Sequence, residues 1–378
     1  MIFDREALLE RETKILAPYA VFGSHTRGRE HKEQSDPTRT PFQRDRDRVI
    51  HSRAFRRLKG KTQVFVAHYG DHYRTRISHS LEVAQVSRDV ARSLGLNEDL
   101  SEVIALAHDL GHTPFGHAGQ DELNDVMKPF GLGFEHNQQS KRIVEFVERI
   151  YPNFRGLNLS FEVRQGLMKH QSPWDQAEST FHGSSLEAQL VNIADEIAYN
   201  NHDVDDGLRS GLITEAMLEE LEIWHAARND VEQEYGKIDD AYSRLSRTIS
   251  AMFGRMIQDL VEHSHSLIMA SGVQSLEDVY RREDKLIQFS PTQFKRNEAL
   301  RAFLSQKIYH HPNVIELSQR GQRIIRELFA QYHGDLSLLP SEEQEDIVAG
   351  ERAEIVIKDY IAGMTDGFAE LEWERLCQ

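Results

Sequence analysis

The segment Ser101–Gly119 carries the residue types in this chain that are best suited to metal chemistry. His108 stands next to Asp109, and His112 and His117 follow within the same ten residues. A single buried histidine is usually an ordinary core residue, but several imidazoles beside a carboxylate suit a divalent metal ion. An adjacent His-Asp pair supplies at most two ligands, so the remaining ligands must come from other segments.

The apolar spacing of this segment predicts a helix that positions the pair. Apolar residues recur at helical spacing from Val103 to Leu110, and we expect Gly111 to end the helix. His108 and Asp109 then lie on its last turn, where the helix dipole favours a cation.

Two further helices are expected to bring the missing ligands. Residues 74–94 show helical apolar spacing with His79 near the start, and residues 184–208 form a longer pattern of the same kind. Asp195 interrupts the apolar face of the second helix, and a buried charge is costly unless it is paired or bound to a metal. The set His79, His108–Asp109 and Asp195 resembles the H…HD…D pattern of the HD-domain metal-dependent phosphohydrolases.

Longer strings make this resemblance more specific. They are RTPFQRDRDRVIHSRAFRRLKGKTQVF (Arg39–Phe65), HDLGHTPFGHAG (His108–Gly119), FEHNQQS (Phe134–Ser140), ADEIAYNNHDVDDGL (Ala194–Leu208) and DYIAGMTDGFA (Asp359–Ala369). In this order they resemble the deoxyguanosinetriphosphate triphosphohydrolase-like family. The resemblance implies an all-α fold, with an N-terminal arm and basic segment (1–65), an HD metal-binding core (66–212) and a helical C-terminal region (213–378) in one compact unit.

The resemblance also implies a role for three groups of residues. The implied metal ligands are His79, His108, Asp109 and Asp195. The implied substrate contacts are Gln63, Arg76, His112, Tyr199 and Asp203. The implied catalytic group is His117, His136 and Gln120.

These roles agree with the chemistry of the side chains. The guanidinium fork of Arg76 suits phosphate oxygens, and the imidazoles of His117 and His136 suit proton transfer near neutral pH. Tyr199 and Asp203 share a helical stripe with Asp195. In the family, the tyrosine lies beneath the sugar and excludes a 2′-hydroxyl, while the aspartate binds the 3′-hydroxyl. Without the resemblance, a core tyrosine beside surface acids remains an alternative.

Gln120 departs from the family pattern. Three residues after His117 the family usually has a carboxylate that orients this histidine, and we expect Gln120 to take that place here. An amide can hold an imidazole by a hydrogen bond, but it cannot stabilise an imidazolium by charge.

The charge distribution is uneven along the chain. The 378 residues carry a net charge of −16, yet nine basic residues stand against two acidic ones between Arg39 and Lys61. This basic segment indicates a polyanionic partner, either a triphosphate or a single-stranded nucleic acid bound through its phosphates. Residues 20–50, which overlap the start of this segment, are polar and are expected to form a loop or arm because they contain Gly23, Gly28, Pro37 and Pro41.

The remaining sequence indicates a cytoplasmic protein with a helical C-terminal half. Cys377 is the single cysteine, so no intrachain disulfide forms, and no apolar run is long enough to span a membrane. His170 is expected in the core or behind the site. Helices are predicted over Met217–Tyr235, Ala241–Ser264, Phe294–Tyr309, Ile315–Gly334 and Glu342–Ile361.

Together these observations predict a metal-dependent hydrolase that converts a deoxynucleoside triphosphate (dNTP) and water to deoxynucleoside and triphosphate. One divalent ion (Mn²⁺, Mg²⁺, Fe²⁺ or Ni²⁺) and a homo-oligomer are expected. A different HD phosphohydrolase, acting on cyclic nucleotides, monophosphates or guanosine polyphosphates, is the first alternative. A nucleic-acid-binding regulatory module is the second, and the pI near 5.6 with the full ligand set counts against it.

Overall fold

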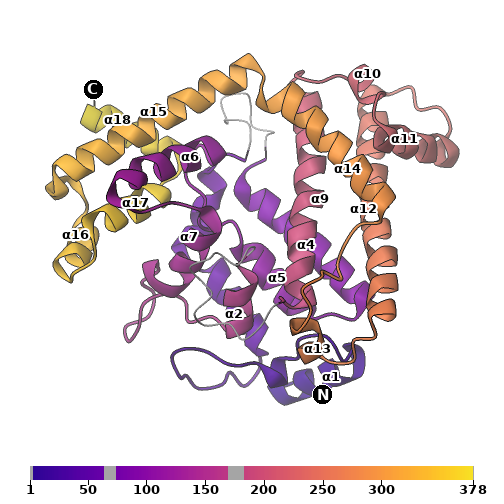
Figure 1. The fold of residues 1–378 in the computed structure, drawn as a ribbon, viewed down its shortest axis with the longest axis horizontal. Coiled ribbons are helices and arrows are strands. Elements are labelled where there is room, and N and C mark those ends of the chain that lie inside the picture. Colours follow the sequence, from indigo (N-terminus) through magenta and orange to yellow (C-terminus); the bar gives the residue numbers. More distant parts are fainter. Residues whose placement is uncertain (1–2, 64–73, 169–182, 378) are drawn as a thin grey trace.

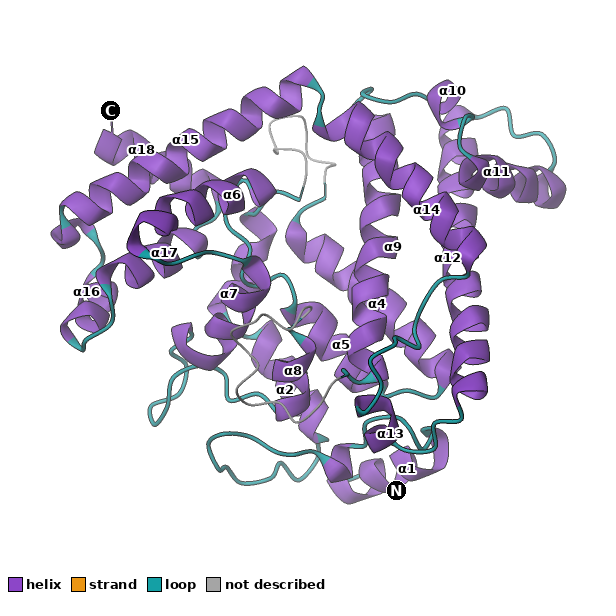
Figure 2. Ribbon diagram, in the orientation of Figure 1, coloured by secondary structure: helices purple, strands orange, loops and turns teal. Residues whose placement is uncertain are grey.

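The computed structural model describes residues 3–63, 74–168 and 183–377, and His170 lies outside these ranges. Within them the chain is all-helical, as predicted, and forms no β-strand (Figures 1 and 2). The helices of the first half are α1 (Arg5–Ile15), α2 (Pro41–Ile50), α3 (Arg53–Arg57), α4 (Arg76–Leu94), α5 (Glu98–Ala107), α6 (Gly116–Met127), α7 (His136–Arg142), α8 (Phe161–Gly166) and α9 (Leu186–Arg209).

The second half continues the same architecture. Its helices are α10 (Glu215–Leu218), α11 (Glu222–Tyr235), α12 (Ala241–Ser271), α13 (Leu276–Tyr280), α14 (Pro291–Leu304), α15 (Pro312–Gly334), α16 (Ser341–Val348), α17 (Ala353–Ala362) and α18 (Asp366–Cys377). Two π-helical segments, Ile143–Val147 and Ser305–Tyr309, follow α7 and α14 directly. No helix within the described ranges is both long enough and apolar enough to cross a membrane.

Helix α5 lies at the centre of the larger hydrophobic core. Leu100, Val103 and Ile104 are fully buried, because α5 contacts α2, α4 and α9 on different sides. Asn97 caps its start by accepting a hydrogen bond from the Leu100 backbone N–H. This surrounded helix therefore holds the residues that follow its C-terminus in a fixed place.

A second core joins α6 to the C-terminal helices. Leu123 and Met127 of α6 are fully buried with Ile324 and Leu328 of α15 and Ile357 of α17. Figure 1 shows α15 running along α6, with α17 and α18 beside them. The C-terminal helices consequently pack on the segment that follows the His-Asp pair.

Several helix boundaries differ from the sequence-based predictions, and in three places a helix is added or divided. Residues 41–50 form helix α2 rather than a loop, because Thr40 and Gln43 make a capping box and Pro41 occupies the first turn. The predicted helix over residues 342–361 is divided into α16 and α17 at Gly350, whose φ of 109° a helix cannot accommodate. Likewise, residues 219–221 separate α10 from α11.

The prediction that Gly111 ends the helix was wrong. Helix α5 ends at Ala107, and Gly111 instead lies against the backbone of α7. Its N–H donates to the hydroxyl of Ser140 (2.8 Å), and that hydroxyl donates to the carbonyl of His108 (2.7 Å). Glycine is needed here for close approach, since a Cβ would lie 2.2 Å from the His136 carbonyl oxygen.

Replacing Gly111 with alanine should therefore destabilise the fold. The added methyl group meets backbone atoms, which cannot move aside as a flexible side chain can, so we expect the free energy of unfolding to fall by about 3 kcal/mol. Urea denaturation followed by circular dichroism measures this. Gly367→Ala is the control, because a Cβ at that position of α18 meets nothing within 4 Å. Equal loss in both variants would contradict the role given to Gly111.

Candidate functional site

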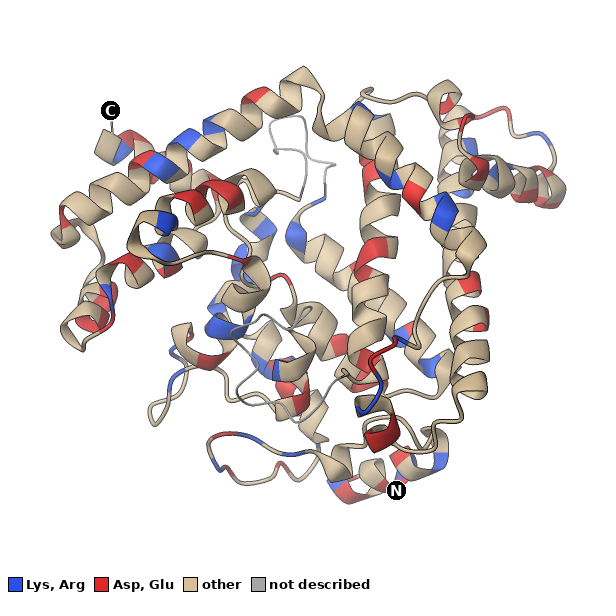
Figure 3. Cartoon of the chain, viewed as in Figure 1, with Lys and Arg blue, Asp and Glu red and all other residues tan. Residues whose placement is uncertain are grey.

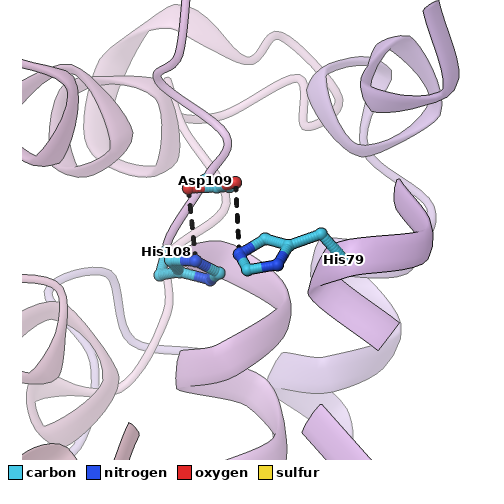
Figure 4. Close-up of side chains that lie close together, drawn as sticks. All are labelled: His79, His108 and Asp109. Atoms are coloured by element: carbon cyan, nitrogen blue, oxygen red, sulfur yellow. Dashed lines mark ion pairs between the residues drawn. The ribbon is translucent and has the colours of Figure 1, made fainter. Parts of the chain in front are cut away.

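The four predicted metal ligands come together from three elements. His79 lies on α4, His108 and Asp109 follow α5, and Asp195 lies on α9. The Nε2 atom of His108 is 3.2 Å from Asp109 Oδ1, and the Nε2 atom of His79 is 4.0 Å from Asp109 Oδ2. Figure 4 shows both rings facing the Asp109 carboxylate. Asp195 Oδ1 lies 3.0 Å from His79 Nε2 and 3.5 Å from His108 Nε2.

The donor atoms of this group fit a divalent metal. One ligand atom from each of His79, His108 and Asp109 lies within 4.8 Å of the others, and all three residues are buried. His108 Nδ1 lies 2.6 Å from the Ala105 carbonyl oxygen, which can only accept, so this nitrogen carries the proton. The lone pair of His108 is then on Nε2, which faces the carboxylates, and this is the tautomer that binds a metal through Nε2.

Positive charge around Asp109 keeps this carboxylate ionised. Arg76 Nη1 donates to Asp109 Oδ2 (2.8 Å), and both side chains are buried. Burial opposes ionisation, but His108, His112 and Arg76 outweigh it and hold the pKa of Asp109 well below its ordinary value. The Nε–H of Arg76 has no acceptor among the described residues, so the guanidinium retains a donor for an anion.

Three histidines adjoin the metal-ligand group on one side. His112 Nε2 lies 3.2 Å from Asp109 Oδ1, and the His112 ring stacks on that of His136 with 4.0 Å between centroids. The His117 ring meets His112 and His136 edge-on, at 5.5 Å and 6.2 Å. Burial and the charge of Arg76 hold the pKa of His112 well below its ordinary value, so this imidazole is neutral near pH 7.

Gln120 lies against His136 rather than forming the contact expected with His117. Its Oε1 is 2.7 Å from His136 Nδ1 and also accepts a hydrogen bond from the His136 backbone N–H (3.3 Å). The reason is geometric: α6 and α7 face each other at this point, whereas His117 projects to an exposed position. Because an amide oxygen only accepts, His136 carries its proton on Nδ1, which leaves Nε2 as the acceptor.

A cavity of about 320 Å³ lies next to these histidines. His117 is part of its wall, together with Gln63 from the predicted substrate contacts. The Gln63 side-chain oxygen is buried without a hydrogen-bond partner among the described residues. The remaining lining residues are Thr62, Phe115, Gly116, Ala118, Tyr199, Ser210, Leu212, Tyr309, Asn313, Val314, Leu317 and Ser318.

Tyr199 and Asp203 are joined by a residue that the sequence analysis missed. Tyr309 donates a hydrogen bond from its hydroxyl to Asp203, and its ring centroid is 6.1 Å from that of Tyr199. Burial raises the pKa of Asp203 to about 8. Tyr309 ends the π-helical segment after α14, and such segments are frequent at functional sites. The spacing of apolar residues in the sequence does not show that residues 305–309 form a π-helical turn, so it does not place Tyr309 at the site.

Most charges of the basic segment are neutralised within the protein. Lys61 is buried and donates to the carbonyls of His112 (2.5 Å) and Ala362 (2.7 Å). Ion pairs with acidic side chains hold Arg39, Arg44, Arg46, Arg48 and Arg53. Figure 3 shows blue and red segments interspersed here rather than a continuous basic face.

The fold and the ligand group define an HD-domain phosphohydrolase. An HD domain model matches residues 76–200, and a model described as a phosphohydrolase-associated domain matches residues 287–375. A deoxyguanosinetriphosphate triphosphohydrolase-like protein of Geobacter sulfurreducens is 46% identical over 387 residues, covering 99% of this chain and 98% of its own length.

Relatives of the same description occur in other bacteria. That of Nitrosomonas europaea is 49% identical over 369 residues (96% of this chain, 97% of the relative), and that of Bordetella pertussis is 49% identical over 372 residues (96% of each). The chain belongs to the deoxyguanosinetriphosphate triphosphohydrolase-like family.

Loss of either carboxylate should remove the metal. Asp109→Asn keeps the shape of the side chain but takes away its charge, and Asp195→Ala removes an oxygen ligand at a half-buried position. We expect metal analysis after dialysis to find little divalent metal in either variant, with an unchanged helical circular dichroism spectrum. Asp121→Ala, which removes an exposed carboxylate of α6, is the control. Full metal content in both variants would refute the ligand assignment.

Proposed function

We propose that this protein hydrolyses dNTPs to deoxynucleoside and intact triphosphate. The supporting observation is the position of the 320 Å³ cavity beside the His/Asp group. His117 belongs to both the cavity wall and the histidine cluster, and Tyr199 lies one helical turn after Asp195 on α9. A nucleotide with its base and sugar in the cavity would therefore have its α-phosphate near the ligand group.

The phosphate side of the proposed complex is buried and contains Arg76 and His112. Arg76, whose Nε–H has no acceptor among the described residues, is the group that would donate to phosphate oxygens. His112, the other predicted phosphate contact, faces Asp109 with Nε2, so its neutral ring donates there and leaves Nδ1 as an acceptor. His79, His108, Asp109 and Asp195 would hold a divalent ion, which when bound polarises the α-phosphate and positions water. The mixed nitrogen and oxygen donors suit Mn²⁺, Fe²⁺, Mg²⁺ or Ni²⁺ better than a closed zinc site.

The nucleoside side would recognise a deoxyribose. Asp203, fixed by the Tyr309 hydroxyl, would accept a hydrogen bond from the 3′-hydroxyl, and the paired Tyr199 and Tyr309 rings would fill the place of a 2′-hydroxyl. Gln63, with its free amide oxygen, would bind the sugar or the base. A site built this way rejects a ribonucleotide, because the added hydroxyl clashes or loses its solvation.

In the proposed reaction the oxygen of water bonds to the α-phosphorus, and the bond from phosphorus to the 5′-oxygen breaks. The 5′-oxygen takes up a proton and leaves as part of the nucleoside, while the triphosphate keeps its two anhydride bonds. His136, whose Nε2 is an acceptor, and His117, at the cavity wall, are the groups proposed to move protons.

The other expectations from the sequence concern nucleic-acid binding, the oligomeric state, the cellular location and an alternative activity. Binding of single-stranded nucleic acid through Arg39–Lys61 has little support, since most of those charges are paired internally. A homo-oligomer and a cytoplasmic location remain predictions from the sequence and the family. Product analysis separates the proposed activity from that of a different HD phosphohydrolase, because only the proposed activity releases intact triphosphate.

Reaction in ¹⁸O-labelled water tests where the bond breaks. With dGTP as substrate, the label should appear in triphosphate and be absent from deoxyguanosine, because water attacks phosphorus rather than carbon. GTP should react at least about tenfold more slowly, given the two tyrosine rings at the sugar. Label in a nucleoside monophosphate, or equal rates with GTP and dGTP, would refute the scheme.

Gln120→Glu tests the role of His136. A carboxylate 2.7 Å from Nδ1 favours the protonated ring, so a step that needs neutral His136 should lose rate at a higher pH than in the native protein. We expect the acidic limb of the kcat/KM profile to move upward by about one pH unit. Gln138→Glu, at an exposed position of α7, adds the same charge away from the ring and should leave the limb in place.

A further inference from the structure

The carboxylate of Asp366, at the start of α18, holds two segments that lie far away in the sequence. Its Oδ1 accepts a hydrogen bond from the Phe115 backbone N–H (3.0 Å), and its Oδ2 accepts one from the Thr62 backbone N–H (2.9 Å). The Thr62 hydroxyl donates to the same Oδ2. Asp366 and Thr62 are buried, so these bonds form away from bulk water.

Both of these segments form walls of the cavity. Thr62 and Phe115 line it directly, Gln63 follows Thr62, and His117 follows Phe115 by two residues. Asp366 is not among the lining residues; it acts from behind the wall. A single side chain of the C-terminal region thus connects the wall that carries Gln63 to the wall that carries His117.

The backbone at Phe115 requires such support. Phe115 has a φ of 62°, a left-handed conformation that is costly for a residue other than glycine. Its side chain packs closely on α15, where a Cβ on Gly321 would come within 2.7 Å of the Phe115 Cβ. The hydrogen bond to Asp366 and this contact together keep Phe115 in an unfavourable conformation at the start of α6.

Neighbouring contacts support the same connection. Lys61 joins the His112 carbonyl to that of Ala362, the last residue of α17, and burial together with the charge of Arg76 lowers the pKa of Lys61 to about 7. Thr365 packs on Gly60, where a Cβ would lie 2.9 Å from its Cγ2. Residues 60–62 are therefore in contact with the C-terminal region at three successive positions.

We propose that Asp366 is a positioning residue for nucleoside binding, through which the C-terminal helices fix the two cavity walls at Thr62 and Phe115. This inference rests on the proposed function for its substrate, since the cavity must receive the nucleoside. It assigns to α18 a part in substrate affinity, although α18 contributes no atom to the cavity wall.

Asp366→Asn is the decisive variant because an asparagine has one acceptor oxygen where Asp366 uses two. The amide oxygen can serve Thr62 or Phe115, while its NH₂ group must face the other N–H donor. A buried donor left without an acceptor weakens the structure locally. We expect faster amide exchange in peptides containing residues 61–63 and 115–117, and a KM for dGTP raised about tenfold with a smaller change in kcat.

Asp359→Asn is the matched control. Asp359 also joins the C-terminal region to the rest of the chain, by accepting hydrogen bonds from Gln139 (2.8 Å) and Arg142 (2.7 Å), but it does not line this cavity. If Asp366 only attaches the C-terminal helices, the two variants should have similar effects on stability, amide exchange and KM. Such equality would overturn the proposal, as would faster exchange in Asp366→Asn with an unchanged KM.

A second pair of variants covers the case in which Asp366→Asn does not fold. Thr62→Val keeps the volume but removes the hydroxyl donor to Asp366, whereas Thr62→Ser retains a hydroxyl. Thr62→Val should have a higher KM for dGTP than the native protein, whereas Thr62→Ser should have the native KM. Equal KM values in the two variants would contradict the proposal.

Failure of the proposed function can be told apart from failure of this inference. If the native protein hydrolyses no dNTP, the proposed function fails. Unchanged amide exchange in Asp366→Asn would separately overturn the positioning role.

Discussion

The buried ion pair between Asp109 and Arg76 is the interaction on which this site depends. Arg76 donates to Asp109, and His108 and His112 each place a ring nitrogen 3.2 Å from the same carboxylate. All four side chains are buried, so the carboxylate stays ionised only because the guanidinium is close. Arg76 begins α4 and both histidines lie between α5 and α6, so the order of these elements brings the three groups to one carboxylate.

Several residues of the candidate site stand at helix ends. Arg76 begins α4, His136 begins α7, and Tyr309 ends the π-helical segment after α14. Backbone groups at such ends lack helical partners, and here side chains satisfy them: Ser140 donates to the His108 carbonyl, and Asp366 accepts from Phe115. The hydrogen bonds that stabilise the helix ends therefore also hold the site residues in position.

The helices could be predicted from the sequence, and a ligand group could be proposed from it, whereas the contacts around that group could not. Asp195 stood out because its charge interrupts an apolar face at helical spacing, and His79 because it fits the H…HD…D pattern that the chain resembles. The partner of Gln120 was not, since the approach of α6 to α7 depends on tertiary packing. Tyr309 and Asp366 were missed for a similar reason: each acts across more than a hundred residues, and spacing along one helix carries no information about such contacts.

The two cores of the fold explain why the C-terminal region can influence a site whose ligands it does not supply. The larger core fixes α4, α5 and α9, and with them the four residues proposed as metal ligands. The start of α6 belongs to the other core, which α15, α17 and α18 complete. Phe115 and His117 stand at this junction, so the position of the cavity relative to the His/Asp group depends on how the two cores meet. Asp366, which bonds to Thr62 on one side and Phe115 on the other, is a direct polar link across that junction.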